Sequence, residues 1–286
     1  MITVRLNGGL GNQLFQYSTA RALAFKHCVP LRIDCSNYEF YDVHPFRLKF
    51  LRCSGEFSAK TGLLNRYLNN IKFIRWLKLL GLARKNYLES SLEYDEKICE
   101  LDSDARLYGY FQTEKYFLNI RHLLLAELMP NDSQVSKISD QVEEIRRSQC
   151  ISLHIRRGDY VSNPAASQIH GVCELDYYYD AISYIKSVRS VDKAVVYVFS
   201  DDIEWCRKNL TLDDDVRYIT GFDDEPELDL YLMSCCTDNV ISNSTFSWWA
   251  AWLNCNANKI VVAPDAWFQS KTHSSNDLIP DSWVRM

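Results

Sequence analysis

Two consecutive arginines, a glycine and a carboxylate, Arg156-Arg157-Gly158-Asp159, end an apolar run that begins at Ile151. Buried charges without partners are costly, so the cluster implies either an anionic ligand or a salt-bridge network within the protein. Guanidinium forks match the geometry of phosphate oxygens, and ligands of parallel sheets gather at the carboxyl ends of strands. We therefore predict a pyrophosphate site at the arginine pair, with the salt-bridge network as the alternative.

The strand that leads to the arginines carries a second candidate. Period-two alternation places Ser152, His154 and Arg156 on one face of this strand. His154 could bond a nucleobase or ribose, or it could be a buried histidine with a backbone partner. Asp159 could be a general base, or the counter-ion that fixes an arginine. The sequence leaves both choices open.

Polar residues follow two other apolar runs. Ser200 and Asp201 come directly after the run 194–199, where they could cap the next helix or meet a ligand. Thr245 and Ser247 lie in a series of small polar residues before a helix start, and free N–H groups at such a start favour a phosphate. These residues are predicted to lie beside the arginine pair.

Acidic residues give two further candidates. Asp229 lies in the first turn of a predicted helix, where it could accept from the amino group of a base or only complement the helix dipole. The run 213–215 is Asp-Asp-Asp and contains the acid-x-acid pattern of metal-dependent nucleotide-sugar enzymes. Its setting predicts a solvated loop, so we expect the arginine pair, and no metal, to stabilise charge.

The first element to position these residues is a βαβ unit at the start of the chain. We predict a strand over 2–6, a helix over about 12–27 and a strand over 31–34, joined by the glycine-rich loop 7–12. The glycines are spaced G-G-x-G. Because a dinucleotide site is typified by G-x-G-x-x-G, an NAD-dependent oxidoreductase is disfavoured.

The second half of the chain alternates short apolar strands with helices. We predict strands at 150–155, 194–199, 216–220, 239–241 and 259–263, and helices at about 133–148, 176–187, 202–209, 225–236 and from 245. This alternation predicts a doubly wound parallel sheet. We place a domain boundary in the turn-rich break after Pro130, giving domains 1–132 and 133–286.

Composition limits the class of protein. The chain has 286 residues, 47% of them hydrophobic, and a formal net charge of −5, which predict a two-domain globular protein and argue against nucleic-acid binding. Ten cysteines without a C-x-x-C pair predict free thiols in a reducing cytoplasm. No segment is long and apolar enough for a signal peptide or a membrane span. A basic helix predicted at 70–80, with Lys72, Arg75 and Lys78, could rest on an anionic membrane or be an ordinary half-buried helix.

Three motifs together resemble one known family. They are Gly8-Gly-Leu-Gly-Asn-Gln-Leu-Phe-Gln-Tyr17, His154-Ile-Arg-Arg-Gly-Asp-Tyr160 and Ser242-Asn-Ser-Thr-Phe-Ser-Trp-Trp249. From residue 1 to about 265 the chain resembles the α-1,2-fucosyltransferases in their short bacterial form without a membrane anchor. The resemblance implies a GT-B-type α/β fold: two Rossmann-like domains with mostly parallel sheets, facing across a cleft. The first domain would lie on the acceptor side and the second would bind GDP-fucose.

The resemblance also implies a reaction. L-Fucose would pass from GDP-fucose to the 2-hydroxyl of a terminal β-galactoside, with inversion and no required metal or other cofactor. The galactose-containing acceptor would be a surface-polysaccharide (O-antigen) unit, plausibly lipid-linked, and the enzyme would be cytoplasmic with at most peripheral contact with the inner membrane. A non-catalytic nucleotide-sugar or glycan-binding protein of the same fold is the alternative.

The resemblance further suggests roles for the candidate residues. Arg156 and Arg157 would contact the donor pyrophosphate, and His154 and Asp229 would lie near the guanosine. A donor phosphate would be contacted by Ser247 with Thr245, and Asn12 would face the β-phosphate or the fucose across the cleft. Ser200 and Asp201 complete the predicted donor site, and Asp159 is the candidate general base.

Overall fold

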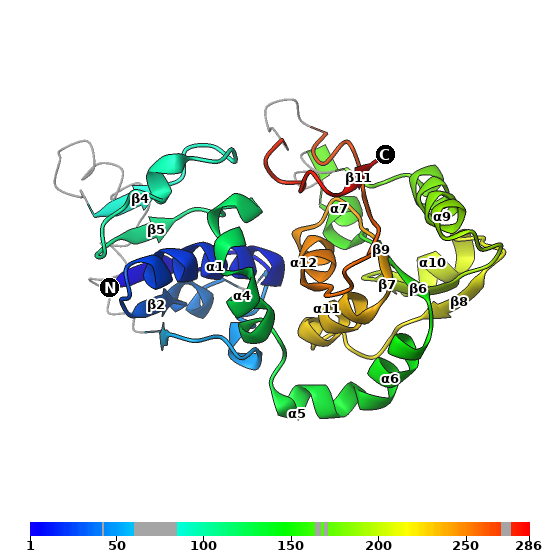
Figure 1. Ribbon diagram of the computed structural model, residues 1–286, viewed down its shortest axis with the longest axis horizontal. Coiled ribbons are helices and arrows are strands. Elements are labelled where there is room, and N and C mark those ends of the chain that lie inside the picture. The colour runs from blue at the N-terminus through cyan, green and yellow to red at the C-terminus, as the bar shows by residue number, and fades with distance from the viewer. Residues whose placement is uncertain (42, 60–84, 164–166, 169–170, 270–275) are drawn as a thin grey trace. The chain divides into compact units, whose positions relative to one another are not determined.

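The chain folds into two compact units, and each is built on one parallel sheet (Figure 1). The computed structural model describes residues 1–41, 43–59, 85–163, 167–168, 171–269 and 276–286. One unit comprises Met1–Met129 with Asn276–Leu278, and the other comprises Pro130–Ser275 with Ile279–Met286. We refer to them as the N-terminal and the C-terminal unit.

The N-terminal unit has a five-stranded sheet in the order β3-β2-β1-β5-β4. All its pairings are parallel, and helix α1 packs against it. Its strands are β1 Ile2–Arg5, β2 Leu31–Asp34, β3 Glu56–Ser58, β4 Asn86–Leu88 and β5 Arg106–Tyr108. Its α-helices are α1 Leu10–Lys26 and α4 Arg121–Glu127, and its 3-10 helices are Ser36–Glu39, Leu48–Phe50, Glu96–Ile98, Glu114–Tyr116 and Leu118–Ile120.

Two buried glutamines of α1 hold the loops at the carboxyl end of this sheet. Gln16 accepts the backbone N–H of Asn7 at 2.9 Å, and Gln13 accepts that of Arg47 at 2.9 Å. Both side chains are 0% exposed, so each amide satisfies backbone groups that would otherwise be buried without partners. The glutamines of the first sequence motif therefore have a structural role.

The C-terminal unit has a six-stranded parallel sheet in the order β11-β10-β9-β6-β7-β8. Its strands are β6 Cys150–Ile155, β7 Val195–Ser200, β8 Asp215–Tyr218, β9 Asp238–Val240, β10 Val261–Ala263 and β11 Val284–Arg285. Its helices are α5 Asp132–Val135, a 3-10 turn Ser136–Ile138, α6 Ser139–Arg147, α7 Gly158–Ser162, α9 Leu175–Arg189, α10 Ile203–Asn209, α11 Pro226–Cys235 and α12 Thr245–Leu253.

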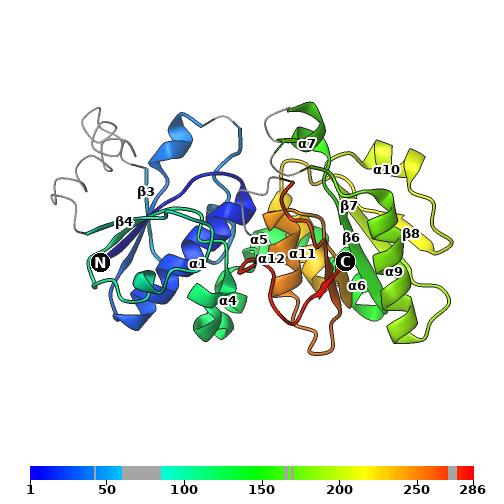
Figure 2. The ribbon, with the colours of Figure 1, turned by 90° about the horizontal axis from the view of Figure 1, so that it is seen from above.

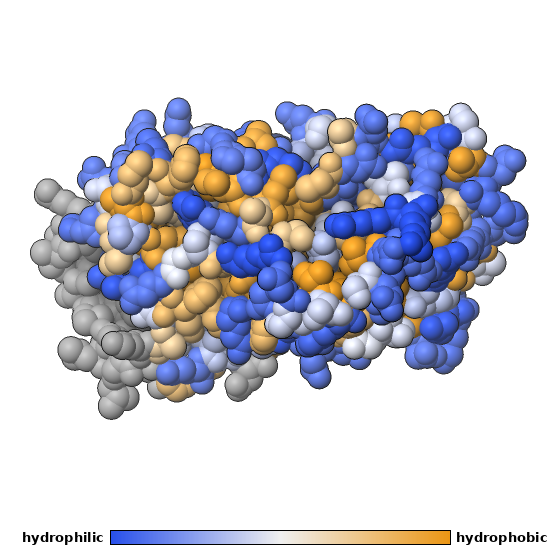
Figure 3. Space-filling model, turned by 60° about the horizontal axis from the view of Figure 1, so that its bottom comes forward, coloured by the Kyte–Doolittle hydropathy of each residue, from blue (hydrophilic) through white to orange (hydrophobic). Residues whose placement is uncertain are grey.

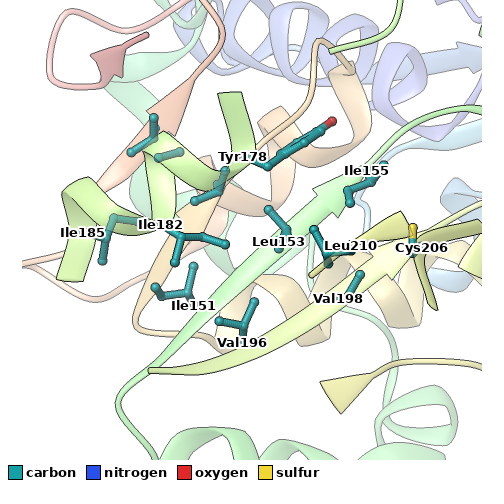
Figure 4. Close-up of a cluster of buried hydrophobic side chains, with 13 residues drawn as sticks. Ile151, Leu153, Ile155, Tyr178, Ile182, Ile185, Val196, Val198, Cys206 and Leu210 are labelled. Carbon is teal, nitrogen blue, oxygen red and sulfur yellow. The ribbon is translucent and has the colours of Figure 1, made fainter. Parts of the chain in front are cut away.

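Helices cover both faces of this second sheet, as the sequence alternation predicts (Figure 2). On one face Leu153 and Ile155 of β6 pack against Tyr178 and Ile182 of α9 (Figure 4). On the other face Ser152 accepts a hydrogen bond from Asn239 of β9 at 2.7 Å, and α11 and α12 lie over this side of the sheet. The predicted alternation of β6 is thus confirmed. Three tryptophans of α12 are at most 3% exposed and belong to the core: Trp248, Trp249 and Trp252.

Some elements differ from the sequence prediction. The expected helix 133–148 is interrupted by the 3-10 turn Ser136–Ile138, where Ile138 is fully buried. Helix α1 begins at Leu10, two residues earlier than expected. Strands β3, β4, β5 and β11 were not predicted. Each has two or three residues and, unlike β9 and β10, lies outside the predicted alternation of strands and helices.

Among the described residues, no helix is long and apolar enough to cross a membrane. On the face shown in Figure 3, polar and charged side chains interrupt the apolar surface of each unit. The basic helix predicted at 70–80 lies outside the described residues.

Candidate functional site

The site predicted from the arginine pair lies at the carboxyl end of β6, between its neighbours β9 and β7. Every residue of β6 is buried, and the chain leaves the sheet at Arg156 and turns into α7 at Gly158. Parallel strands end at the same edge, so β6, β7 and β9 bring Arg156, Asp201 and Ser242 to one edge of the sheet.

Each arginine is held by a different carboxylate. Arg156 Nη1 lies 3.0 Å from Asp201 Oδ2, and Arg157 Nε lies 3.5 Å from Asp202 Oδ2. The guanidinium carbon of Arg157 also stands 3.6 Å from the ring centroid of Trp205, a cation–π contact on the first turn of α10. Both arginine side chains are partly exposed. The salt-bridge alternative is therefore observed, and the pyrophosphate site stays a prediction.

Asp201 holds the backbone turn after β6 as well as the side chain of Arg156. Its Oδ1 accepts the backbone N–H of Arg157 at 2.8 Å while its Oδ2 pairs with Arg156. A Cβ at Gly158 would lie 2.4 Å from Asp201 Oδ2, a distance that real Cβ contacts do not reach. A larger residue at 158 would therefore displace this carboxylate from its position beside Arg156.

The helix cap at the end of β7 differs from the expectation. Asp202, and neither Ser200 nor Asp201, caps α10 by accepting the N–H of Trp205 at 3.1 Å. Ser200 Oγ accepts the N–H of Asp202 at 3.0 Å and so shapes the same turn. The direct contacts of Ser200 and Asp201 with the donor stay predictions.

His154 lies below the arginines and is 4% exposed. Its Nδ1 is 2.9 Å from Ser242 Oγ, so its partner is a side chain and not the expected backbone group. The ring also contacts Phe246 of α12, with centroids 5.6 Å apart. Burial, reinforced by the charge of Arg156, lowers the pKa of His154 to about 3, so the imidazole is neutral at physiological pH.

The N-terminus of α12 is tied to this histidine through buried hydroxyls. Ser244 caps the helix by accepting the N–H of Phe246 at 3.3 Å. Ser247 is 0% exposed, donates to Ser244 O at 3.3 Å and lies 3.5 Å from Ser242 Oγ. Thr245, the first residue of the helix, is only partly buried. Of the two predicted phosphate contacts, Thr245 is thus the more accessible side chain.

Asp229 has an unsatisfied carboxylate oxygen. It lies in the first turn of α11, and its Oδ1 is buried without a hydrogen-bond partner. Burial, with the charges of Asp223 and Glu227, raises the pKa of Asp229 to about 7. By contrast, Glu227 is fully buried but accepts from Gln134 Nε2 at 3.1 Å. An orphaned carboxylate oxygen fits a ligand that donates N–H groups.

The acidic residues at the start of β8 form ion pairs with basic side chains. Asp213 pairs with Lys193, Asp214 with Lys186, and Asp215 with Arg217. Asp214 is 3% exposed, so the run is not the fully solvated loop expected. Within the described ranges, no group of three or more histidine, cysteine or acidic residues could hold a metal ion.

Two further predicted site residues are Asp159 and Asn12. Asp159 belongs to α7, but its side chain lies outside the described part of the chain. Asn12 belongs to α1 of the N-terminal unit, where its Oδ1 accepts from Gln112 Nε2 at 2.9 Å. Gly8 has φ +83°, and a Cβ there would lie 2.6 Å from Asn12 Nδ2, so glycine is needed beside this amide.

Sequence reasoning missed Trp205 and Ser242, which hold Arg157 and His154. Trp205 could have been found from its place in the first helical turn after Ser200-Asp201-Asp202. Ser242 belongs to the third sequence motif, but its role could not be predicted, because its partner His154 is 88 residues away in the sequence.

Comparison with known proteins shows the family of this chain. The description "Glycosyl transferase family 11" matches residues 1–286. An Escherichia coli alpha-1,2-colitosyltransferase is 36% identical, covering 100% of this chain and 99% of its own. The Escherichia coli O-antigen biosynthesis glycosyltransferase WbnK is 33% identical, and the match covers 98% of this chain and 99% of the relative. Galactoside alpha-(1,2)-fucosyltransferase 2 of Oryctolagus cuniculus is 25% identical, covering 99% and 76%.

Solved structures show the same fold. The NodZ alpha-1,6-fucosyltransferase of Bradyrhizobium, soaked with GDP-fucose, has a TM-score of 0.55 at 16% identity, covering 88% of this chain and 92% of that one. Arabidopsis thaliana FUT1 in complex with GDP has a TM-score of 0.58 at 12% identity, covering 99% and 75%. The predicted GT-B-type architecture of two Rossmann-like domains is confirmed. The chain therefore belongs to glycosyl transferase family 11, the family of the α-1,2-fucosyltransferases that its three motifs resemble.

Proposed function

We propose that this glycosyltransferase moves L-fucose from GDP-β-L-fucose to the 2-hydroxyl of a terminal β-galactoside, with inversion at the anomeric carbon. The observation that carries the proposal is the arginine pair at the end of the central strand β6, held by Asp201 and Asp202 and still partly exposed. Membership of family 11, a relative named for galactoside fucosylation and a structural neighbour soaked with GDP-fucose support this choice.

The charges of the site suit this reaction. The acceptor hydroxyl attacks the anomeric carbon from the face opposite GDP, the bond from that carbon to the β-phosphate oxygen breaks, and GDP leaves with the electron pair. Arg156 and Arg157 bind the growing negative charge, and one such donor is typically worth about 2.7–4 kcal/mol in the transition state. The hydroxyl proton goes to a base, for which Asp159 is the candidate.

The remaining donor contacts follow from the unsatisfied groups. Asp229 is assigned to the guanine, whose ring N–H and amino group can supply the donors that its Oδ1 lacks. Thr245 and the free N–H groups of α12 are assigned to a phosphate. Neutral His154 lies behind them and holds Ser242. Asn12, on the acceptor-side domain, is proposed to face the β-phosphate or the fucose.

Transfer of colitose is the second candidate, favoured by the 36% identity to a protein named alpha-1,2-colitosyltransferase. Colitose is fucose without the hydroxyl at carbon 3, so both donors present the same GDP, and the arginine pair and Asp229 would serve either. The choice depends on whether the pocket hydrogen-bonds that hydroxyl, since a site built to bond a hydroxyl rejects the analogue that lacks it.

The decisive assay offers GDP-fucose and GDP-colitose separately with a panel of β-galactosides, with and without EDTA. We expect GDP release and a new α-1,2 linkage with GDP-fucose, unchanged by EDTA. A preference for GDP-colitose would select the second candidate. GDP-fucose binding without GDP release from any acceptor would select the non-catalytic binding protein.

Two arginine variants test the mechanism. Arg156→Ala and Arg157→Ala should each lower kcat by about a hundredfold or more, with little change in the melting temperature, because both guanidinium groups are partly exposed. Near-normal kcat in either variant, at unchanged stability, would remove that arginine from the mechanism.

The acceptor is proposed to be a galactose-containing, lipid-linked oligosaccharide unit of a surface polysaccharide. The relative named for O-antigen biosynthesis supports this assignment. Such a role would place the enzyme in the cytoplasm, at most in peripheral contact with the inner membrane.

A further inference from the structure

In the N-terminal unit, the turn after β5 is held in a strained conformation. Phe111 is fully buried and adopts φ +55°, a region that residues other than glycine rarely occupy. The carboxylate of Glu89 accepts the backbone N–H of Tyr110 at 2.6 Å and that of Phe111 at 2.8 Å. A Cβ at Gly109 would lie 2.4 Å from Glu89 Cβ. Backbone strain that the surrounding structure holds in place clusters at functional sites, so the side chain that this turn presents is a candidate for a function.

The turn presents the side chain of Tyr110, which is 37% exposed. Its hydroxyl accepts from Asn7 Nδ2 at 3.2 Å, and no acceptor for its own proton lies among the described residues. The hydroxyl is therefore held by one hydrogen bond, can donate a further one, and belongs to an exposed side chain.

Amide groups extend from this tyrosine along the carboxyl end of the sheet. Asn7 Oδ1 accepts from Asn37 Nδ2 at 2.9 Å, and Asn37 Oδ1 accepts from Arg5 Nη2 at 3.2 Å. These residues follow or end the adjacent strands β2, β1 and β5, and both asparagines are partly exposed. Tyr110, Asn7 and Asn37 thus form one row, which we name the Tyr110 platform.

A second amide pair stands close to this row. Asn12 Oδ1 accepts from Gln112 Nε2 at 2.9 Å, and both residues are partly exposed. The backbone connects the platform to this pair at two places. Gly8, which lies against Asn12, follows Asn7, and Gln112 is two residues after Tyr110. Neutral donors and acceptors of the amide groups thus lie along the same loops as the exposed Tyr110 side chain.

We propose that the Tyr110 platform binds the acceptor sugar of the transfer reaction. A pyranose presents an apolar C–H face that can lie on an aromatic ring, and rim hydroxyls that both donate and accept hydrogen bonds, as amides and a tyrosine hydroxyl do. The hydrogen-bonding groups of the three platform residues are neutral, and the cation that contacts the row, Arg5, donates to Asn37 at its end. The proposal rests on the proposed function for the identity of the sugar, a β-galactoside.

The test uses the full-length protein and the variants Tyr110→Ala and Tyr110→Phe, with Phe25→Ala as the matched control. Phe25 is 47% exposed and lies at the far end of α1 from the platform. We expect Tyr110→Phe, which loses one hydrogen bond, to raise the KM for the galactoside about fivefold, and Tyr110→Ala to raise it about tenfold or more. The KM for GDP-fucose and the slow hydrolysis of GDP-fucose without acceptor should stay unchanged, as should every parameter of Phe25→Ala.

An unchanged galactoside KM in Tyr110→Ala, or a parallel rise in both KM values, would overturn the proposal. Should Tyr110→Ala fail to fold, Tyr110→Phe and Asn37→Ala apply the same criterion.

Saturation-transfer NMR with a panel of methyl glycosides and no donor distinguishes failure of the platform proposal from failure of the proposed function. Sugar signals that are present with the wild type and lost in Tyr110→Ala would support the platform even if no fucose is transferred. The absence of signal from every glycoside with the wild type would overturn it.

Discussion

The carboxylate of Asp201 lies 3.0 Å from the guanidinium of Arg156, and its other oxygen bonds the backbone of the next residue. One side chain from β7 thus sets the position of a charge carried by β6. The candidate site is built from pairs of this kind, and five predictions follow from them and from the titrating groups of the site.

Asp201 is expected to act through Arg156. Asp201→Asn keeps an acceptor for the backbone N–H but loses the charge, and should lower kcat about tenfold, the lower end for a hydrogen bond to a charged group. Asp201→Ala loses both contacts and should lower kcat further, with a lower melting temperature. Steady-state kinetics and thermal unfolding measure these changes. Asp213→Asn, which breaks an exposed ion pair with Lys193, is the control and should match the wild type. Equal activity of Asp201→Ala and the wild type would refute the role.

Gly158→Ala should reduce activity because its Cβ would meet Asp201 Oδ2. In an Asp201→Ala background the nearest remaining atom of residue 201 is its Cβ, at 3.8 Å, which is an ordinary contact. We therefore expect Gly158→Ala to have little further effect in that background. A double-mutant cycle on kcat measures the coupling, and strictly additive losses would contradict the predicted clash.

The raised pKa of Asp229 predicts two pH dependences. Between about pH 4 and pH 7 the folded carboxyl holds a proton that the unfolded chain releases, so this group makes the free energy of unfolding decrease as pH rises. Asp229→Asn should therefore stabilise the protein relative to the wild type more at pH 8 than at pH 5. Urea unfolding at both pH values measures the difference.

GDP binding should show the opposite trend, because guanine donors require the ionised carboxylate. We expect affinity for GDP to rise about tenfold from pH 6 to pH 8, beyond the change in Asp229→Asn, as one linked proton near pH 7 implies. Calorimetry with both proteins isolates this effect from the titration of the phosphate. Parallel profiles for the two proteins would exclude Asp229 from guanine binding.

His154 predicts acid sensitivity. Its pKa of about 3 lies below that of an exposed imidazole, so between these values the unfolded chain binds a proton that the folded protein excludes. Stability should be lost as pH falls below about 6.5, by about 2 kcal/mol at pH 5. The non-titrating variant His154→Gln should be less stable at pH 7 but lose less on acidification. Urea unfolding at pH 7 and pH 5 measures how much unfolding free energy each protein loses on acidification. An equal loss in the two proteins would disprove the assignment.

The sequence predicted the framework of the C-terminal unit because its strands are apolar and regularly spaced. The run 150–155 gave the limits of β6 directly, and its alternation separated the face of His154 from that of Leu153. In the N-terminal unit, strands of three residues gave no comparable pattern.

The position of the two arginines was predictable, but their pairing was not. The arginines ended an apolar strand, which placed them at the carboxyl edge of the sheet. Nothing local distinguished Asp201 from Asp202, which follow each other in sequence. One holds Arg156 and the other caps α10, because the backbone turn at Ser200 directs their side chains differently. Such pairings depend on tertiary structure and cannot be read from spacing.

The missing side chain at position 158 also has an evolutionary consequence. Because a methyl group there would occupy the space of the Asp201 carboxylate, the two positions cannot vary independently. Descendants of a common ancestor should keep glycine at 158 for as long as they keep the acid at 201. A lineage that acquires a larger residue at 158 should carry a compensating loss at 201, together with a replacement anchor for its first arginine.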